Sequence, residues 1–158
     1  MNIFYKINLH LNLLKYSINF LFKKKKDKYT RFLEKTLNKK KGFYIDVGCY
    51  HPIRLSNTKF LYDKGWKGIN IDINEKSIDL FRITRKKDIN LNVGIGNKKK
   101  LLSAYYQKSL FPLNTLVFEH AKKFLKNPIK KKIKVVTLES VINKYAKNKK
   151  IYFIDIDC

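Results

Sequence analysis

Two aspartates stand at the ends of apolar runs, where packing alone gives them no role. Asp46 closes the apolar run 43–45, and Asp72 interrupts the isoleucine-rich run 69–73. Burying a carboxylate costs free energy unless a partner binds it. Open α/β sheets bind ligands just beyond the carboxyl ends of their strands, which is where both aspartates would lie. The stretch 43–74 therefore predicts strand, loop, helix and strand around a nucleotide-type ligand.

The loop 46–52 contains a single glycine, Gly48, which lets the backbone turn sharply and approach a ligand closely. A pyrophosphate-binding loop needs several glycines and a helix N-terminus directed at phosphate. Tyr50, His51 and Pro52 would also crowd such a loop. The loop thus favours a ligand without phosphate, such as S-adenosylmethionine, over a dinucleotide.

Two further side chains suit the adenosine part of such a ligand. An acidic residue at the end of a second strand, here Asp72, can accept hydrogen bonds from both ribose hydroxyls. The alternative is that Asp72 caps the helix that follows. Asn92, on a third strand, offers a donor and an acceptor to an adenine edge, or is an ordinary polar strand residue.

The histidine and cysteine of the loop have simpler alternatives. His51 is a candidate base or substrate-orienting group, and the alternative is that it only holds the loop. Cys49 has no visible partner base, so nucleophilic catalysis by its thiol is not expected. We predict no metal site.

The elements that must position these residues alternate between strands and helices. Strands are predicted at 42–47, 68–73, 89–95, 101–106, 133–136 and 151–156, and helices at 30–39, 56–64, 75–85, 114–127 and 138–145. Such alternation predicts a parallel sheet covered by helices. Ser56 is the expected N-cap of the second helix, which Gly65 should end. In the first helix Phe32, Leu33 and Leu37 should share one packed side.

The end of the sequence repeats the opening pattern. Asp155 and Asp157 accompany the apolar run 151–156. With Asp46 and Asp72, four of the twelve acidic residues therefore occupy the ends of predicted core strands. Scattered surface charge would not cluster in this way.

The formal net charge of +24 suggests nucleic acid or an anionic membrane as a partner. Against nucleic acid, 32 of the 36 basic residues are Lys, whereas proteins that bind phosphates and bases favour the bidentate Arg. Lys, Asn and Ile share AT-rich codons, so genome bias is an alternative source of the charge. Two cysteines, too few for a disulfide framework, suit a reducing cytoplasm.

Residues 1–28 form a separate basic, amphipathic segment. Leu9, Leu13, Tyr16 and Phe20 follow helical spacing, and a lysine run at 23–26 follows them. Polar residues interrupt every window long enough to span a bilayer. We expect a helix that packs on protein or mediates oligomerisation, and peripheral contact with an anionic membrane is the alternative.

The sequence resembles the FkbM family of S-adenosylmethionine-dependent methyltransferases over about residues 42–158. The resemblance rests on IDVGCYHPIRLSNTKFLYDKGWKGINIDIN (45–74), DINLNVGIGN (88–97), PLNTLVFEHAKKF (112–124), VVTLESVINKY (135–145) and FIDIDC (153–158). It implies a Rossmann-like class I methyltransferase fold and methyl transfer to an oxygen of a sugar or another small hydroxyl compound.

The resemblance also implies roles for single residues. Asp46, Gly48 and Tyr50 would line the methionine end of the cofactor. Asp72 would hold the ribose, and Asn92 would lie near the adenine. Ser56 and Asn57, in the matching SNT block, would also face the site.

The chain departs from the family at its end, where Ile-Asp-Val-Glu-Gly is usual and residues 154–158 read IDIDC. Without the strands that usually follow, 151–156 would be an exposed apolar edge, which natural proteins avoid. We therefore expect a partial methyltransferase domain at 29–158 that lacks the last strands, in a C-terminally truncated chain.

The resulting prediction is a cytoplasmic O-methyltransferase with Asp155 or His51 as the base that takes the hydroxyl proton. Two alternatives remain at this point. One is an inactive remnant with the cofactor-type fold, and the other is a basic protein that binds nucleic acid or a membrane surface.

Overall fold

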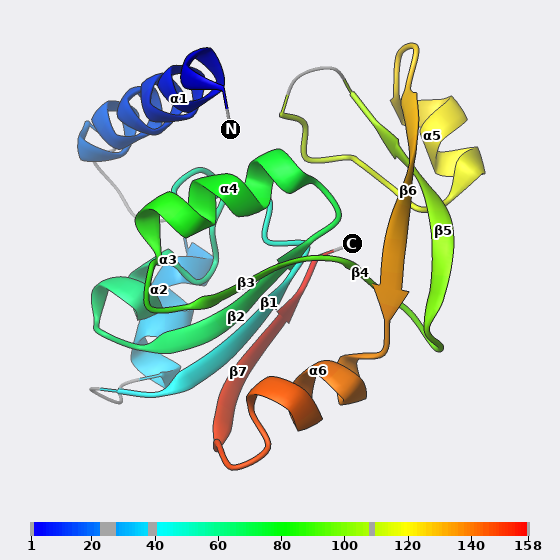
Figure 1. The fold of residues 1–158 in the computed structure, drawn as a ribbon. Helices are drawn as coiled ribbons and strands as arrows, with labels where there is room; N and C mark the ends of the chain where they lie inside the picture. Colours follow the sequence, from blue (N-terminus) through cyan, green and yellow to red (C-terminus); the bar gives the residue numbers. More distant parts are fainter. Residues whose placement is uncertain (1, 23–27, 38–40, 108–109, 158) are drawn as a thin grey trace.

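The computed structural model describes residues 2–22, 28–37, 41–107 and 110–157, coloured along the chain in Figure 1. The helices are α1 (Ile3–Leu21), α2 (Lys28–Thr36), α3 (Lys59–Asp63), α4 (Glu75–Thr84), α5 (Phe118–Phe124) and α6 (Leu138–Tyr145). The strands are β1 (Phe43–Val47), β2 (Lys67–Asp72), β3 (Ile89–Asn92), β4 (Gly94–Ile95), β5 (Lys100–Tyr106), β6 (Ile129–Val136) and β7 (Ile151–Ile156).

The main sheet is parallel and has the strand order β3-β2-β1-β7 (Figure 1). All five residues of β1 are buried, because β1 lies between β2 and β7 and both of its faces are covered. Ile45 and Val47 pack with Ile69 and Ile71 of β2 and with Val141 of α6. The α/β fold with a parallel sheet and flanking helices, predicted from the alternating pattern, is confirmed.

A smaller sheet, β4-β6-β5, lies beside the main one and differs from the predicted strands in two places. The strand expected at 89–95 is split at Val93, so that β3 joins the main sheet and β4 joins the smaller one. Strand β6 begins at Ile129 rather than at residue 133, because antiparallel pairing with β5 extends it through a run of exposed lysines.

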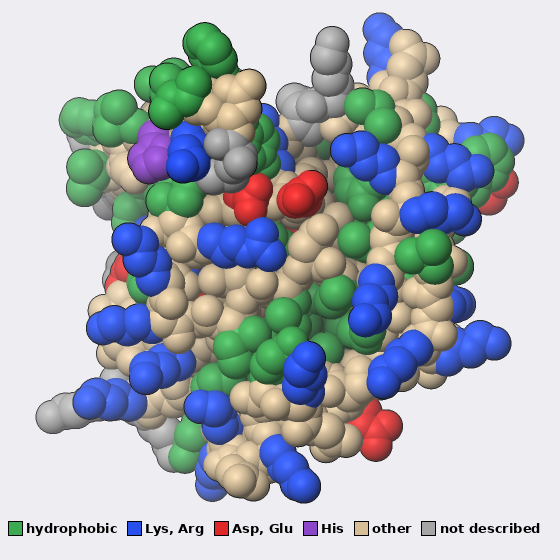
Figure 2. Space-filling model, in the orientation of Figure 1, with side chains coloured by type: hydrophobic (Ala, Val, Ile, Leu, Met, Phe, Trp, Pro, Cys, Tyr) green, Lys and Arg blue, Asp and Glu red, His purple; other side chains and the backbone are tan. Residues whose placement is uncertain are grey.

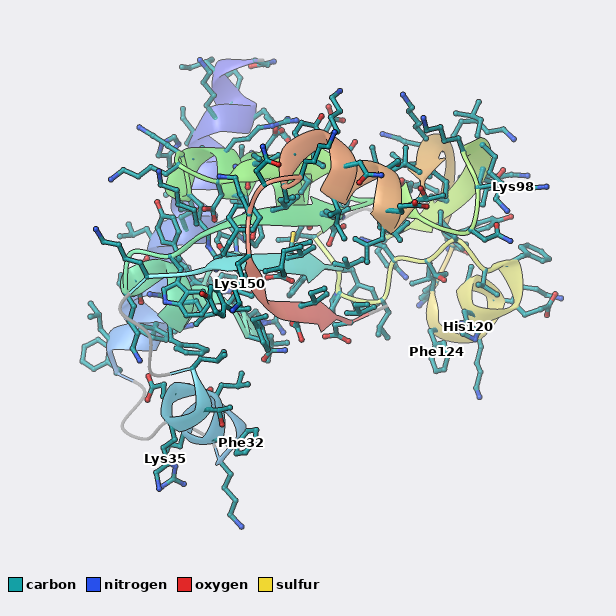
Figure 3. The ribbon with its side chains drawn as sticks, turned by 90° about the horizontal axis from the view of Figure 1, so that it is seen from below. Phe32, Lys35, Lys98, His120, Phe124 and Lys150 are labelled. Atoms are coloured by element: carbon teal, nitrogen blue, oxygen red, sulfur yellow. The ribbon has the colours of Figure 1, made fainter. Side chains whose placement is uncertain are left out.

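Two local predictions about helices are wrong. The helix expected from Ser56 is the short α3, whose N-cap is Thr58, and the Ser56 hydroxyl instead accepts a hydrogen bond from Arg85. Gly65 follows α3 with a φ of +84°, a conformation that favours glycine, as expected for a helix end. On α2, Leu33 is buried, but Phe32 is exposed and, like Lys35, points away from the sheet (Figure 3).

Strand β7 is an edge of the main sheet in the part of the chain that the structure describes. It pairs with β1 on one side, and Ile154 and Ile156 are exposed. Their exposure agrees with the apolar edge expected at 151–156.

Helix α1 packs against α4 through one of its faces (Figure 1). Leu9 and Leu13 are buried against Leu80 of α4, as their helical spacing predicted for a helix that packs on protein. Phe20, expected on the same face, is exposed, and the Lys59 ammonium lies 4.5 Å from the centre of its ring.

Replacing Leu9 by Ala should lower the free energy of unfolding by about 2–4 kcal/mol, because it leaves a cavity between α1 and α4. Leu11→Ala is the matched control, since Leu9 is 0% exposed and Leu11, on the same helix, is 58% exposed. Urea unfolding of both variants measures the difference. Equal effects would contradict the packing of α1 on α4.

Candidate functional site

The loop after β1 is fixed to the end of β2 by backbone hydrogen bonds. The N–H groups of Gly48 and Cys49 both donate to the Ile71 carbonyl oxygen, at 2.8 and 3.1 Å. Gly48 has a φ of +79°, so the turn requires the residue type that the sequence places there. Tyr50 also has a positive φ, of 49°, which is uncommon for a bulky residue. The loop is therefore held in one sharp bend at the carboxyl end of the sheet.

Asp72 holds this loop with its side chain. Its Oδ2 accepts the Tyr50 N–H at 2.8 Å, and its Oδ1 accepts the Asn74 N–H at 2.7 Å. The N-cap of α4 is Asn74, whose side chain accepts from the Lys76 N–H, so Asp72 is not the cap itself. A carboxylate has about four lone-pair sites, and each Asp72 oxygen therefore keeps capacity for a ligand hydroxyl.

A small cavity of about 120 Å³ opens at the carboxyl ends of β1 and β7. Its lining comes from both strands, from the loop and from the segment before α5: Asp46, Gly48, Cys49, Tyr50, Leu55, Ser56, Asn57, Pro112, Leu113, Asp155 and Asp157. Six of the residues predicted for the site are thus brought together here. They come from positions more than 100 residues apart in the chain.

Asp46 and Asp155 are paired in register on neighbouring parallel strands, which places both carboxylates at this cavity. Thr58 Oγ1 donates to Asp46 Oδ2, and Asn57 Nδ2 donates to Asp155 Oδ2 at 3.0 Å. The SNT block therefore contributes to the site by fixing its carboxylates, a role that the sequence did not show.

Burial makes these acids weaker than ordinary aspartates. Desolvation raises the pKa of Asp46 to about 7, although the Thr58 hydrogen bond and the Arg85 charge oppose the change. Desolvation also raises the pKa of Asp72 to about 6, and it raises the pKa of Asp155 as well. Perturbed carboxyl groups in a cleft are typical of functional sites.

A second, larger cavity of about 800 Å³ lies at the carboxyl ends of β2 and β3. Its lining includes Asn74, Asn92 and Tyr106, together with Glu75 and Asp79 of α4. Asp72 connects the two cavities, because its carboxylate binds the backbone of Tyr50 beside one and of Asn74 beside the other.

Asn92 lies in this larger cavity, but the structure already uses its amide donors. Its Nδ2 donates to the carbonyl oxygens of Asp72 and Ile73, at 3.0 and 2.9 Å. The donor and acceptor pair expected to face an adenine edge is therefore reduced to the amide oxygen. The side chain instead fixes the backbone that follows β2.

The large cavity carries both signs of charge, because Lys76, Lys131 and Lys132 line it together with Glu75 and Asp79. Figure 2 shows acidic side chains in the hollow between α4 and the β5–β6 pair, whereas Lys and Arg side chains are spread over much of the remaining face. Glu75 and Asp79 line this cavity, and three further aspartates line the small one. Five of the twelve acidic residues thus surround the two cavities.

His51 does not line either cavity, so the structure does not support it as the base. It is fully buried beneath α1, where its Nε2 lies 2.9 Å from Asn12 Oδ1. Its Nδ1 accepts the backbone N–H groups of Ile53 and Arg54, both at 3.0 Å. Desolvation lowers its pKa to about 4, so the ring is neutral and holds the loop, which was the alternative considered from the sequence.

Cys49 is buried against Ile78 and Phe81, and desolvation raises the pKa of its thiol well above the ordinary value. A protonated thiol in an apolar environment is a poor nucleophile. Among the residues that the structure describes, no group of three or more His, Cys, Asp or Glu side chains could hold a metal ion.

The residue that organises the site is Arg85, which is 1% exposed and was not predicted from the sequence. Its Nη1 donates to the hydroxyls of Tyr44 and Thr58, at 3.0 and 2.8 Å. Its Nη2 donates to the Pro52 carbonyl at 2.9 Å and to Ser56 Oγ at 2.8 Å. One guanidinium thus binds β1, both ends of the loop segment 52–58 and the start of α3.

The model of the FkbM methyltransferase domain matches residues 46–158, which is more than half of the chain. The chain belongs to the FkbM methyltransferase family. Searches of the curated proteins and of the solved structures give no match. The matched range of this FkbM domain begins at Asp46. It includes the carboxyl ends of the strands at which the two cavities lie.

Arg85→Lys should destabilise the FkbM domain by at least about 2 kcal/mol, because an ammonium cannot replace the planar fork of a buried guanidinium. Arg82→Lys is the matched control, with the same change three residues earlier, in the last turn of α4, at a half-exposed side chain that pairs with Asp79. Its effect should stay within about 0.5 kcal/mol. Thermal and urea unfolding measure both, and a tolerated Arg85→Lys would contradict the proposed role.

Proposed function

We propose that this chain binds S-adenosylmethionine across the two cavities and transfers its methyl group to a small hydroxyl compound such as a sugar. The observation that carries the proposal is the acidic cavity formed by Asp46, Asp155 and Asp157 in a protein whose net charge is +24. Membership of the FkbM methyltransferase family supports the methyl-transfer chemistry.

The acidic cavity suits the cationic end of this cofactor. The sulfonium and the α-amino group of S-adenosylmethionine both carry positive charge, and carboxylates in a partly desolvated site bind cations more strongly than in water. The loop that carries Gly48 and Tyr50 lines the same cavity and leaves no nest of glycine N–H groups for a pyrophosphate.

The larger cavity suits the adenosine end. Asp72, between the cavities, can accept hydrogen bonds from ribose hydroxyls while it keeps its two bonds to the backbone. Asn92 contributes its amide oxygen near the base, and Tyr106 adds an aromatic wall.

When bound, S-adenosylmethionine would supply a methyl group on a positively charged sulfur, which an oxygen nucleophile can attack in line. The residues of the chain would then hold the acceptor hydroxyl, orient it and remove its proton, and orientation supplies much of the rate. Asp155 is the proposed base, because it lines the small cavity and desolvation raises its pKa. Asn57 fixes one of its oxygens.

Isothermal titration calorimetry with S-adenosylmethionine should detect saturable binding by the full chain. Asp155→Asn keeps the shape but removes one charge from the cavity, so we expect about tenfold weaker binding. The analogue S-adenosylhomocysteine lacks the sulfonium charge but keeps the α-amino group, and its affinity should change less. Asp63→Asn, an exposed carboxylate paired with Lys59, is the matched control and should leave binding unchanged.

Absence of heat from the folded protein would contradict the proposal and favour an inactive remnant of the fold. Equal losses of affinity for the two ligands would show that Asp155 does not act on the sulfonium, which is the one charge that distinguishes them. Undiminished turnover by Asp155→Asn, once an acceptor is found, would remove it as the base.

Binding of S-adenosylmethionine should strengthen by at least about tenfold from pH 5 to pH 7, since Asp72 and Asp46 ionise with pKa values of about 6 and about 7. Both pKa values are raised, so at the lower pH Asp46 is largely neutral and attracts the cation weakly, and Asp72 is a weaker acceptor for the ribose hydroxyls. Calorimetry at several pH values measures the slope. Asp46→Asn should flatten its upper part, and a slope unchanged in this variant would contradict the assignment.

A further inference from the structure

The outer face of α1 is an apolar stripe that the described part of the protein leaves uncovered. Its members recur at spacings of three and four residues along one side of the helix: Ile3, Phe4, Ile7, Leu11, Leu14, Ile18 and Leu21. All seven side chains are exposed. Figure 2 shows hydrophobic side chains gathered over α1 at the upper left of the view.

This outer stripe lies opposite the face that packs on the domain. At 100° per residue, Leu9 and Leu13 point to the side of the helix away from Leu14 and Ile18. The inner face is already buried against Leu80 of α4, so folding of the chain does not account for the outer one. An apolar patch of this extent usually marks an interaction surface.

The charges around the stripe indicate its partner. Residues 1–26 contain six lysines and no acidic residue. Exposed Lys6 and Lys15 lie at the two borders of the outer stripe, and the lysine run 23–26 follows the helix in the sequence. A second copy would bring the same positive charges to the contact, whereas an anionic surface would complement them.

We propose that α1 lies flat on an anionic lipid bilayer, with its outer stripe among the acyl chains and its lysines at the phosphate groups. None of the described helices is long and apolar enough to cross a membrane. An apolar stripe bordered by lysines is typical of helices that lie in the interface. With 19 residues, α1 would cover about 28 Å of the surface. The inner face would keep the catalytic domain attached.

Flotation of the full chain with vesicles tests the proposal. Vesicles of phosphatidylcholine with about one third phosphatidylserine should bind the protein, and pure phosphatidylcholine vesicles should bind it much more weakly. Leu14→Gln should reduce binding to the anionic vesicles by about tenfold, because it removes one apolar anchor. The 57% exposure of Leu14 means that the thermal stability of this variant should not change.

The controls separate insertion of α1 from the general basicity of the chain. Leu101→Gln, the same change at an exposed leucine of β5, leaves the charge and α1 unaltered and should bind as the wild type does. Lys6→Gln with Lys15→Gln should weaken binding to the anionic vesicles alone. Equal binding by Leu14→Gln and Leu101→Gln would overturn the proposal, because charge without insertion would then explain it.

Light scattering tests the alternative that the outer stripe is an interface between two copies of the chain. If the wild type is a dimer that Leu14→Gln converts to monomers, and vesicle binding is unaffected, the stripe is an interface between copies and the proposal is wrong. A wild type whose mass does not depend on Leu14, with vesicle binding that does, would support it.

Discussion

The buried guanidinium of Arg85 is the interaction on which the site depends. A charge that is 1% exposed needs compensation, and within the described residues it makes no direct ion pair. Instead two hydroxyls stand between it and two carboxylates. Thr58 accepts from Arg85 and donates to Asp46, and Tyr44 accepts from Arg85 and donates to Asp88. The opposite charges are thus linked across β1 by oriented dipoles.

This arrangement has consequences for the acidic cavity. Because Arg85 reaches Asp46 through Thr58, its charge lowers the pKa of Asp46 only partly, and desolvation still raises that pKa to about 7. A direct ion pair would hold the carboxylate ionised and neutralise it toward any ligand. The bridged form leaves Asp46 able to respond to a cation in the cavity, while the same guanidinium fixes the loop segment through Pro52 and Ser56.

Sequence patterns predicted the strands and helices whose own hydrophobic residues determine which faces are buried. The buried runs of β1 and β2 and the amphipathic α6 follow directly from periodicity. The extent of β6 could not be predicted, because Lys130–Lys132 have low strand propensity and are ordered only by pairing with β5. Likewise, the sequence placed Asp46, Asp72 and Asp155 at strand ends. Arg85 resembles Arg82 in the sequence, and the partners that distinguish it lie 15 to 41 residues away.

Helix α1 shows how composition and periodicity can leave an environment undetermined. Apolar residues occupy both sides of this helix, so a stripe through Leu9 and Leu13 and a stripe through Leu11 and Leu14 fit the helical period equally well. The tertiary structure decides between them, because only the first faces α4. A helix that is apolar on two opposite faces and packed on one leaves the second face open to another apolar environment, and the proposed anionic bilayer would also accommodate the lysines at its border.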